Sequence, residues 1–212
     1  IAQWLGTVLP TGSVVAVDAW VNTTSEVEAL QNELKAYGLT LRTDIDPYAE
    51  IWTDRPAAPL SKAFVQGVEY AGESASEKIQ RIREKMGQNG LVVSSLEEVA
   101  WTLNLRADDV AYTPFVLAYA LITPTDTLLY IYKEKVTPEV EAYLKGEGVR
   151  IRPYEAIEED LQALDMPVMV QPEKTNFAIY SAIKTPIRHE SVVAQMLIFK
   201  NEPEIRGFRR AM

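Results

Sequence analysis

The sequence contains no cysteine and a single histidine, His189, among its 212 residues. The absence of cysteine excludes a disulfide framework and any metal site built on thiolates, and it is consistent with a reducing compartment. A dinuclear hydrolase site needs several converging carboxylates and usually histidine as well. We therefore predict no catalytic residue and no metal ligand in this chain, and we interpret His189 as an exposed or locally hydrogen-bonded loop side chain.

Long apolar runs are also missing. No stretch approaches the roughly 20 apolar residues that span a bilayer, and no signal-type segment opens the chain. Acidic residues outnumber basic residues by 30 to 21, and the resulting net charge of -9 repels phosphate backbones. We expect neither a membrane nor a nucleic acid as a partner.

The sequence does contain an ordinary share of hydrophobic residues, 47%, which is enough to build a packed core. A length of 212 residues suits one large domain or about two of ordinary size. The first residue is Ile1 rather than methionine, and we expect the sequence to be a piece of a longer protein.

The most informative stretch runs from residue 94 to residue 124. Ser95 lies three residues before Glu98, which is the spacing of a capping box, and apolar residues follow at helical spacing. A charged break at residues 106–109 comes next. Residues 115–122 are then almost entirely apolar, as in a strand that is buried on both faces. Helix, charged turn and buried strand indicate an α/β domain.

The residues before this stretch predict two separate regions. A short helix at 1–9, a strand at 14–17, a helix capped by Thr23 and Glu26, and a strand at 39–41 form a parallel β-α-β unit. Residues 52–60 contain two prolines and no periodicity, so we expect an extended linker and a domain boundary there.

The second region alternates helices and strands. A helix closed by Gly87 carries an apolar stripe, and we place its four cations, Lys78, Arg81, Arg83 and Lys85, on its outer faces. A hairpin turn after residue 122 makes the sheet mixed rather than parallel. Further predicted elements are strands at 91–93, 128–132, 149–151 and 168–170, helices starting at Thr137 and Thr175 and spanning 157–164 and 201–212, and an extended crossing at 186–187.

One long motif is formed by Ser95 to Trp101, Asn104 to Arg106, Asp109, Tyr112, Pro114, Tyr119 and Ala120. In this motif the chain resembles the middle domain of the three-domain Xaa-Pro aminopeptidases (aminopeptidase P). Two shorter motifs match Ile51 to Pro56 with Pro59, and Lys200, Asn201, Glu204, Gly207 and Arg209 to Ala211. The chain departs from the family at Thr113, where the family has Asn, and at Ala107, where it has Gly. The alanine indicates that a positive φ is not required there or is strained.

The resemblance implies a domain organisation and a fold. Residues 1–58 correspond to the C-terminal part of the first creatinase-like domain, residues 59–199 to the complete middle domain, and residues 200–212 to the start of the first helix of the catalytic domain. The implied fold is α/β, a mixed β-sheet flanked by helices with the creatinase/prolidase N-terminal-domain (ribonuclease H-like) topology. The pita-bread catalytic domain, which holds two metal ions, usually manganese, has no matching ligand motif in this sequence.

The resemblance also implies a function. We expect a non-catalytic fragment of a cytoplasmic metallopeptidase that releases the N-terminal residue from peptides with proline in second position. Its partners would be the catalytic domain of the same chain, the peptide substrate of the full-length protein and, through exposed apolar faces, a second copy in a homodimer. The alternative is a stand-alone, catalytically inactive α/β module with a binding or regulatory role.

Four residues are candidates for a site. Arg106, Asp109 and Tyr112 lie at the helix-strand turn and could face the active-site cleft of the family; the alternative is an exposed Arg-Asp pair that only stabilises the turn. Trp101 lies off the apolar stripe of its helix, so it could be an interdomain contact, and core packing is the alternative. The adjacent acids at 158–160 point in different directions on a helix and predict a solvated face.

Overall fold

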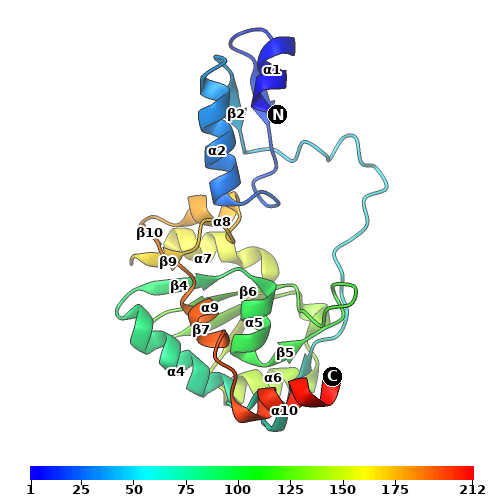
Figure 1. The fold of residues 1–212 in the computed structure, drawn as a ribbon, viewed down its shortest axis with the longest axis vertical. Helices are drawn as coiled ribbons and strands as arrows, with labels where there is room; N and C mark the ends of the chain where they lie inside the picture. The colour runs from blue at the N-terminus through cyan, green and yellow to red at the C-terminus, as the bar shows by residue number, and fades with distance from the viewer. The chain divides into compact units, whose positions relative to one another are not determined.

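The computed structural model describes residues 1–212 and divides into two compact units (Figure 1). Unit 1 comprises Ile1–Ala57 and Pro172–Ala182, and unit 2 comprises Ala58–Gln171 and Ile183–Met212. The domain boundaries expected after residues 58 and 199 stay predictions. The short segment Pro172–Ala182, although distant in sequence, packs with unit 1.

Unit 1 contains α1 (Ala2–Val8), β1 (Val14–Ala16), α2 (Thr24–Lys35), β2 (Thr40–Arg42) and α8 (Phe177–Ala182). The parallel pairing of β1 with β2 and the helix between them confirm the predicted β-α-β unit. The predicted capping box also forms, because the Thr23 side chain accepts from the Glu26 amide while the Glu26 carboxylate accepts from the Thr23 amide. No helix or strand occurs in residues 43–63, which include the predicted linker.

Unit 2 is built around a six-stranded sheet. Its elements are β3 (Phe64–Val65), α3 (Val68–Ala71), α4 (Ala75–Met86), β4 (Gly90–Val93), α5 (Leu96–Leu103), β5 (Leu105–Arg106), β6 (Ala118–Ile122), β7 (Thr127–Ile131), η1 (Lys133–Lys135), α6 (Pro138–Gly146), β8 (Arg150–Pro153), η2 (Tyr154–Ala156), α7 (Ile157–Ala163), β9 (Val168–Val170), β10 (Pro186–Arg188), α9 (Val192–Leu197) and α10 (Glu202–Ala211). The predicted α/β class is confirmed.

The strand order is β10-β9-β4-β6-β7-β8. The pairs β10/β9, β9/β4 and β7/β8 are parallel, whereas β4/β6 and β6/β7 are antiparallel, so the sheet is mixed as predicted. All of β6 is buried, which confirms the interpretation of its apolar run as a strand covered on both faces. The expected extended crossing near residue 186 is an edge strand, β10.

Helices cover both faces of this sheet. On one face, apolar side chains of α4, α5, α6 and α9 share a core with alternate residues of β4, β6 and β7. Figure 1 shows α5 and α9 in front of the strands. On the other face, the Tyr130 hydroxyl in β7 donates to Asp160 of α7 at 2.9 Å. The connections that leave β7 and β8 therefore pass to opposite faces of the sheet.

The structure corrects two local predictions in α5 and the residues after it. The Ser95 side chain makes no cap hydrogen bond, and the Glu98 carboxylate accepts from Ser191 at the start of α9, at 2.7 Å. A tertiary bond between two helices thus uses the side chain that local spacing assigned to a cap. The charged break is also more ordered than expected, because Leu105 and Arg106 form β5, which pairs antiparallel with β3.

Candidate functional site

Helix α10 is attached to the body of unit 2 through its first turn. Asn201 caps the helix, since its side chain accepts from the Glu204 amide while its own amide donates to the Glu204 carboxylate. The side-chain amide of Asn201, as distinct from its backbone N–H, donates to the Ala71 carbonyl at 2.8 Å. Helices α3 and α10 lie side by side (Figure 1). Gly72 has a φ of 75°, and a Cβ there would lie 2.5 Å from the Asn201 side chain. A glycine is therefore required where the two helices meet.

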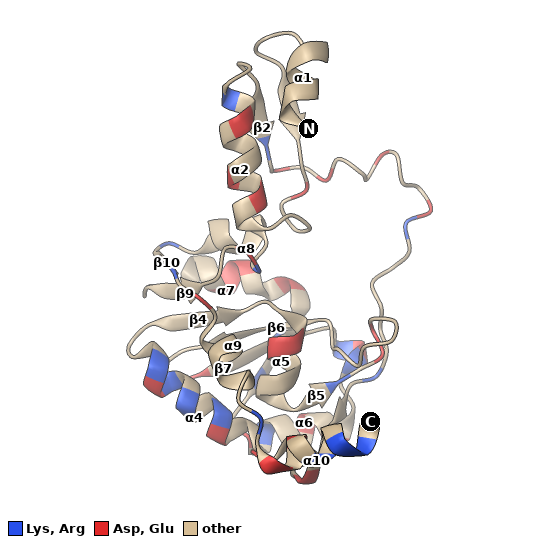
Figure 2. Ribbon diagram, in the orientation of Figure 1, with Lys and Arg blue, Asp and Glu red and all other residues tan.

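The two ends of α10 carry opposite charges. Glu202 and Glu204 occupy its first turn and Arg209 and Arg210 its last, a distribution that suits the helix dipole (Figure 2). None of its residues is buried, and Phe208 exposes 58% of its surface. The helix thus adds little to the core of unit 2 and presents most of its surface outward.

Trp101, the candidate interdomain contact, belongs to α5 and its side chain reaches α10. Its indole N–H donates to the Glu204 carboxylate at 3.2 Å. The Lys78 ammonium lies 4.5 Å from the centre of its ring, within the range of a cation–π interaction. The indole therefore lies between the Lys78 ammonium and the Glu204 carboxylate. That carboxylate belongs to the segment that the sequence assigned to the catalytic domain.

Lys78 was wrongly placed on the outer face of its helix. Only 1% of the residue is exposed, and its ammonium donates to the Trp101 carbonyl at 2.8 Å and to the Asn104 side chain at 2.6 Å. Burial lowers its pKa to about 8, although the nearby carboxylates of Glu204 and Glu73 raise it in part. The spacing could have revealed this position, because residues 75, 78, 79, 82 and 86 form one helical face.

Arg106 supports the C-terminal end of α5. Its guanidinium donates to the carbonyls of Ala100 at 2.6 Å and Leu105 at 2.8 Å. Burial lowers its pKa, and the charge of Glu204 opposes that shift. The Arg-Asp pair that was the alternative interpretation does not form, because the hydrogen bonds of Arg106 go to backbone carbonyls.

Asp109, the second candidate in this group, has a side chain that is buried rather than exposed. Its side chain is inaccessible to solvent and pairs with the equally inaccessible ammonium of Lys135. It also accepts from the Ser61 hydroxyl and the Leu117 amide, both at 2.6 Å. Burial opposes its ionisation, but these donors outweigh burial and hold its pKa below the usual range. Asp109 thus anchors the loop after β5 to the start of unit 2.

Tyr112 is the exposed member of the group. It lies between Val110 and Thr113, which form an isolated bridge, and its relative exposure is 105%. Its φ of 65° is unusual for a residue with a Cβ, whereas Ala107 does not have a positive φ. Tyr112 is therefore an exposed aromatic side chain on a loop that Asp109 anchors.

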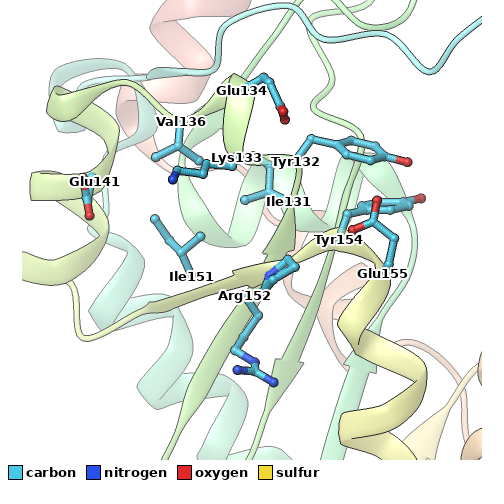
Figure 3. Close-up of a pocket in the computed structure, with 11 residues that line it drawn as sticks. Ile131, Tyr132, Lys133, Glu134, Val136, Glu141, Ile151, Arg152, Tyr154 and Glu155 are labelled. Carbon is cyan, nitrogen blue, oxygen red and sulfur yellow. The ribbon is translucent and has the colours of Figure 1, made fainter.

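A pocket of about 560 Å³, which no local pattern in the sequence had indicated, opens beside β7 and β8 (Figure 3). Ile131, Val136 and Ile151 supply apolar side chains, and Tyr132 and Tyr154 form one wall. The rings of Tyr132 and Tyr154 stack at 4.5 Å between centroids. The aromatic residues that directly follow β7 and β8 were the available signal, but only the register of the two strands brings them together.

The described residues include no group of three or more His, Asp or Glu side chains that could hold a metal ion. The ring of His189, which was interpreted as a loop histidine, is exposed, and its Nδ1 lies 2.6 Å from the Glu190 carbonyl. No helix of the structure has both the length and the apolar character needed to cross a membrane.

Comparisons with known proteins agree with the resemblance found in the sequence. A family model described as creatinase/prolidase N-terminal domain matches residues 54–204. A probable Xaa-Pro aminopeptidase P of Leptosphaeria maculans is 35% identical over 99% of this chain, which spans 38% of that protein. A protein of the same description from Phaeosphaeria nodorum is 34% identical over 99% of the chain, which spans 35% of it.

A solved structure is similar over the same length. It is the X-prolyl aminopeptidase of Caenorhabditis elegans, described as a cytosolic enzyme with a di-nuclear active site. The TM-score is 0.90 and the identity 28%, and the match covers 99% of this chain and 37% of that one. The chain therefore spans little more than a third of the length of the relatives that it matches, and the predicted resemblance to Xaa-Pro aminopeptidases is confirmed.

Proposed function

Because this chain belongs to the creatinase/prolidase N-terminal domain family, we propose that it is a non-catalytic part of an Xaa-Pro aminopeptidase. In this proposal it provides a scaffold and one wall of the active-site cleft to a catalytic domain elsewhere in the same protein. That domain would hold a dinuclear metal centre, with manganese as the expected ion, and would release the N-terminal residue from peptides with proline in second position. The whole enzyme would act in the cytoplasm.

One observation carries the scaffold function: α10 is hydrogen-bonded at its first turn and touches Tyr70 of α3 through Arg210 in its last turn, while its outer side stays exposed. Trp101 and Ala71 hold that first turn through Glu204 and Asn201, as described above. The exposed Phe208 lies on the part of the helix that this attachment does not cover. A helix held in this way can transmit a fixed orientation to a domain that packs against its outer surface.

The donor set of this chain supports placing the metal centre in the other domain. A dinuclear hydrolase needs several converging carboxylate or imidazole ligands, and the described residues offer no such group. We therefore assign no step of the reaction to side chains of this chain.

We propose that Tyr112 reaches the cleft and limits the length or orientation of the peptide that enters. Arg106 and Asp109 would act through the loop, since the first supports the end of α5 and the second is inaccessible to solvent. The exposure of Tyr112 makes it the appropriate side chain to test, because its replacement removes no core contact.

The test of the scaffold function compares this chain with the whole enzyme. Titration calorimetry with Mn²⁺ and a cleavage assay on an Xaa-Pro peptide should give neither stoichiometric binding nor turnover for this chain, and both for the whole enzyme. Stoichiometric Mn²⁺ binding with cleavage by this chain would refute the proposal, since its own carboxylates would then form the catalytic site.

The test of the cleft wall uses Tyr112→Ser in the whole enzyme. We expect KM for a peptide of about ten residues to change severalfold while KM for an Xaa-Pro dipeptide changes less, because a rim side chain acts on the distant part of the substrate. Tyr48→Ser is the matched control, since Tyr48 is another exposed tyrosine, 44% accessible. Equal kinetic constants for both variants and the parent enzyme would show that Tyr112 does not line the cleft.

The pocket beside β7 and β8 favours the second candidate function, a stand-alone binding or regulatory module. Its volume of about 560 Å³ is sufficient for a small ligand. The two functions differ in the need for a catalytic partner. Xaa-Pro cleavage by a whole enzyme that contains this chain would support the scaffold function, whereas a stand-alone module would act without that partner and its α10 would need no further contact.

A further inference from the structure

The pocket occupies the place in the sheet where ligand sites commonly form. β7 and β8 are adjacent and parallel, and their carboxyl ends lie together at one edge. The chain leaves β7 through η1 to α6 on one face and leaves β8 through η2 to α7 on the other. Diverging connections of this kind leave a crevice outside the carboxyl ends of the strands, and ligands of open α/β sheets bind in such crevices.

Three stacked tyrosines make one wall of the pocket rigid. Tyr154 stacks on Tyr119 at 5.1 Å and on Tyr132 at 4.5 Å between ring centroids. Tyr119 is buried in β6, so the stack is anchored in the sheet, whereas Tyr132 is half-buried and lines the pocket. A ring that is held in place in this way can receive a flat group with little loss of side-chain entropy.

The remaining walls combine an apolar surface with excess negative charge. Val136 and Ile151 supply aliphatic surface over the buried Ile131, and all three are labelled in Figure 3. The lining carboxylates are those of Glu134, Glu141 and Glu155, which are exposed and form no ion pair in the structure.

Two cations also line the pocket, but only one of them is uncompensated. Arg152 is paired with Asp160 at 2.7 Å, and Lys133 is the unpaired cation among the lining residues. The Lys62 ammonium, which donates to the Glu134 carbonyl, adds a second positive charge beside the pocket, so the three carboxylates still leave an excess of one negative charge. Burial is the main cause that raises the pKa of Tyr132, and the nearby charge of Glu155 adds to it. The field at the tyrosine wall is therefore negative and favours a positively charged ligand.

We propose that this pocket binds the arginine side chain of a peptide. The planar guanidinium would stack on the Tyr132 ring and lie near the Glu134 and Glu155 carboxylates. Its methylene stem would lie along the aliphatic surface of Val136 and Ile151, which are both partly exposed. The inference goes beyond the proposed scaffold function and does not depend on it, since it needs neither a metal nor a catalytic domain.

The first test compares two small ligands of equal size on the 212-residue chain. N-acetyl-L-argininamide carries the guanidinium, and N-acetyl-L-citrullinamide replaces it with a neutral urea group. We expect the arginine ligand to shift the aromatic NMR resonances of Tyr132 and Tyr154 and to bind about tenfold more tightly than the citrulline ligand at low salt. Equal affinity for the two ligands, or no shift of the Tyr132 resonances at saturating concentration, would overturn the proposal.

The second test locates the charge that the ligand needs. The double variant Glu134→Gln/Glu155→Gln should weaken arginine binding about three- to tenfold, because both replacements are exposed and remove only charge. Glu139→Gln is the matched control, as Glu139 is an exposed carboxylate of α6 outside the pocket. A similar loss in the control would mean that net charge alone attracts the ligand, and an unchanged affinity in the double variant would place the ligand elsewhere. Because no peptide is cleaved here, either result leaves the test of the scaffold function intact.

Discussion

Trp101 of α5 donates its indole N–H to the carboxylate of Glu204 in α10, across 3.2 Å and 103 positions of sequence. The other oxygen of the same carboxylate accepts from the Asn201 amide and closes the cap of α10. A single carboxylate thus determines where the helix begins and to which surface it is attached.

Trp101→Phe should loosen α10 without removing its cap. The phenyl ring keeps an aromatic face for Lys78 but has no N–H, so the Glu204 carboxylate loses one donor, at a cost of about 1 kcal/mol. We expect faster hydrogen exchange of the α10 amides and little change in the sheet. Trp52→Phe is the control, because Trp52 is exposed and lies in unit 1; equal exchange of the α10 amides in both variants would show that the indole bond does not hold the helix.

Lys78 should make stability depend on alkaline pH. Its pKa of about 8 in the folded protein lies below the ordinary lysine value of 10.5, so between these two pH values the unfolded chain binds the proton that the folded chain has released. Stability therefore rises with pH across this window, by about 3 kcal/mol in all, and is flat with respect to Lys78 below it. The measurement is the free energy of unfolding from pH 7 to 10.5, compared with Lys78→Met.

The comparison with Lys78→Met isolates this group, because titrations elsewhere occur in both proteins. Lys85→Met on the exposed face of the same helix should reproduce the pH dependence of the unmodified chain. A difference between the parent and Lys78→Met that does not vary between pH 8 and 10.5 would contradict the buried position of the ammonium.

Asp109→Asn should be among the most destabilising single changes in unit 2. It leaves the inaccessible ammonium of Lys135 without its counter-charge, a loss that typically costs about 3–5 kcal/mol. Asp108→Asn, one residue earlier and exposed, should change the midpoint of urea unfolding very little. Because the pKa of Asp109 is lowered in the folded protein, its ionisation stabilises the fold at pH values above the pKa of the unfolded chain, about 4. This contribution to the free energy of unfolding is lost as pH falls below that value.

Two serines at helix starts should respond differently to replacement by alanine. The Ser74 side chain accepts from the Glu77 amide, so Ser74→Ala should cost about 1 kcal/mol. The Ser95 side chain makes no cap hydrogen bond, so Ser95→Ala should cost less than Ser74→Ala. Thermal unfolding of the two variants checks the order, and a larger loss for Ser95→Ala would mean that the sequence-based capping box exists in solution.

Much of the fold could be predicted because its signals are local. The capping box at Thr23 and the apolar run of β6 each predicted an element that the structure confirms. The motif shared with Xaa-Pro aminopeptidases also predicted the family, since a long match of residue types at fixed spacing is specific. The identical spacing at Ser95 failed, because the Glu98 carboxylate bonds to Ser191, 93 residues away.

The candidate site was predicted less well, for a physical reason. Sequence placed Arg106, Asp109 and Tyr112 together at one turn, but their exposures and partners differ, because each depends on segments distant in sequence. Asp109 meets Lys135 and Ser61 only after the chain has folded. The tyrosine wall likewise depends on the register that brings β7 and β8 side by side.

The sequence by itself determined the α/β class, the order of most helices and strands, and the family, because periodicity, caps and motifs are properties of neighbouring residues. Only the tertiary structure decided that Lys78 and Asp109 are buried charges, that Trp101 holds α10, and that a pocket opens beside β7 and β8. Burial and long-range hydrogen bonds arise when distant segments pack and water is excluded between them, and no local pattern specifies which segments those are.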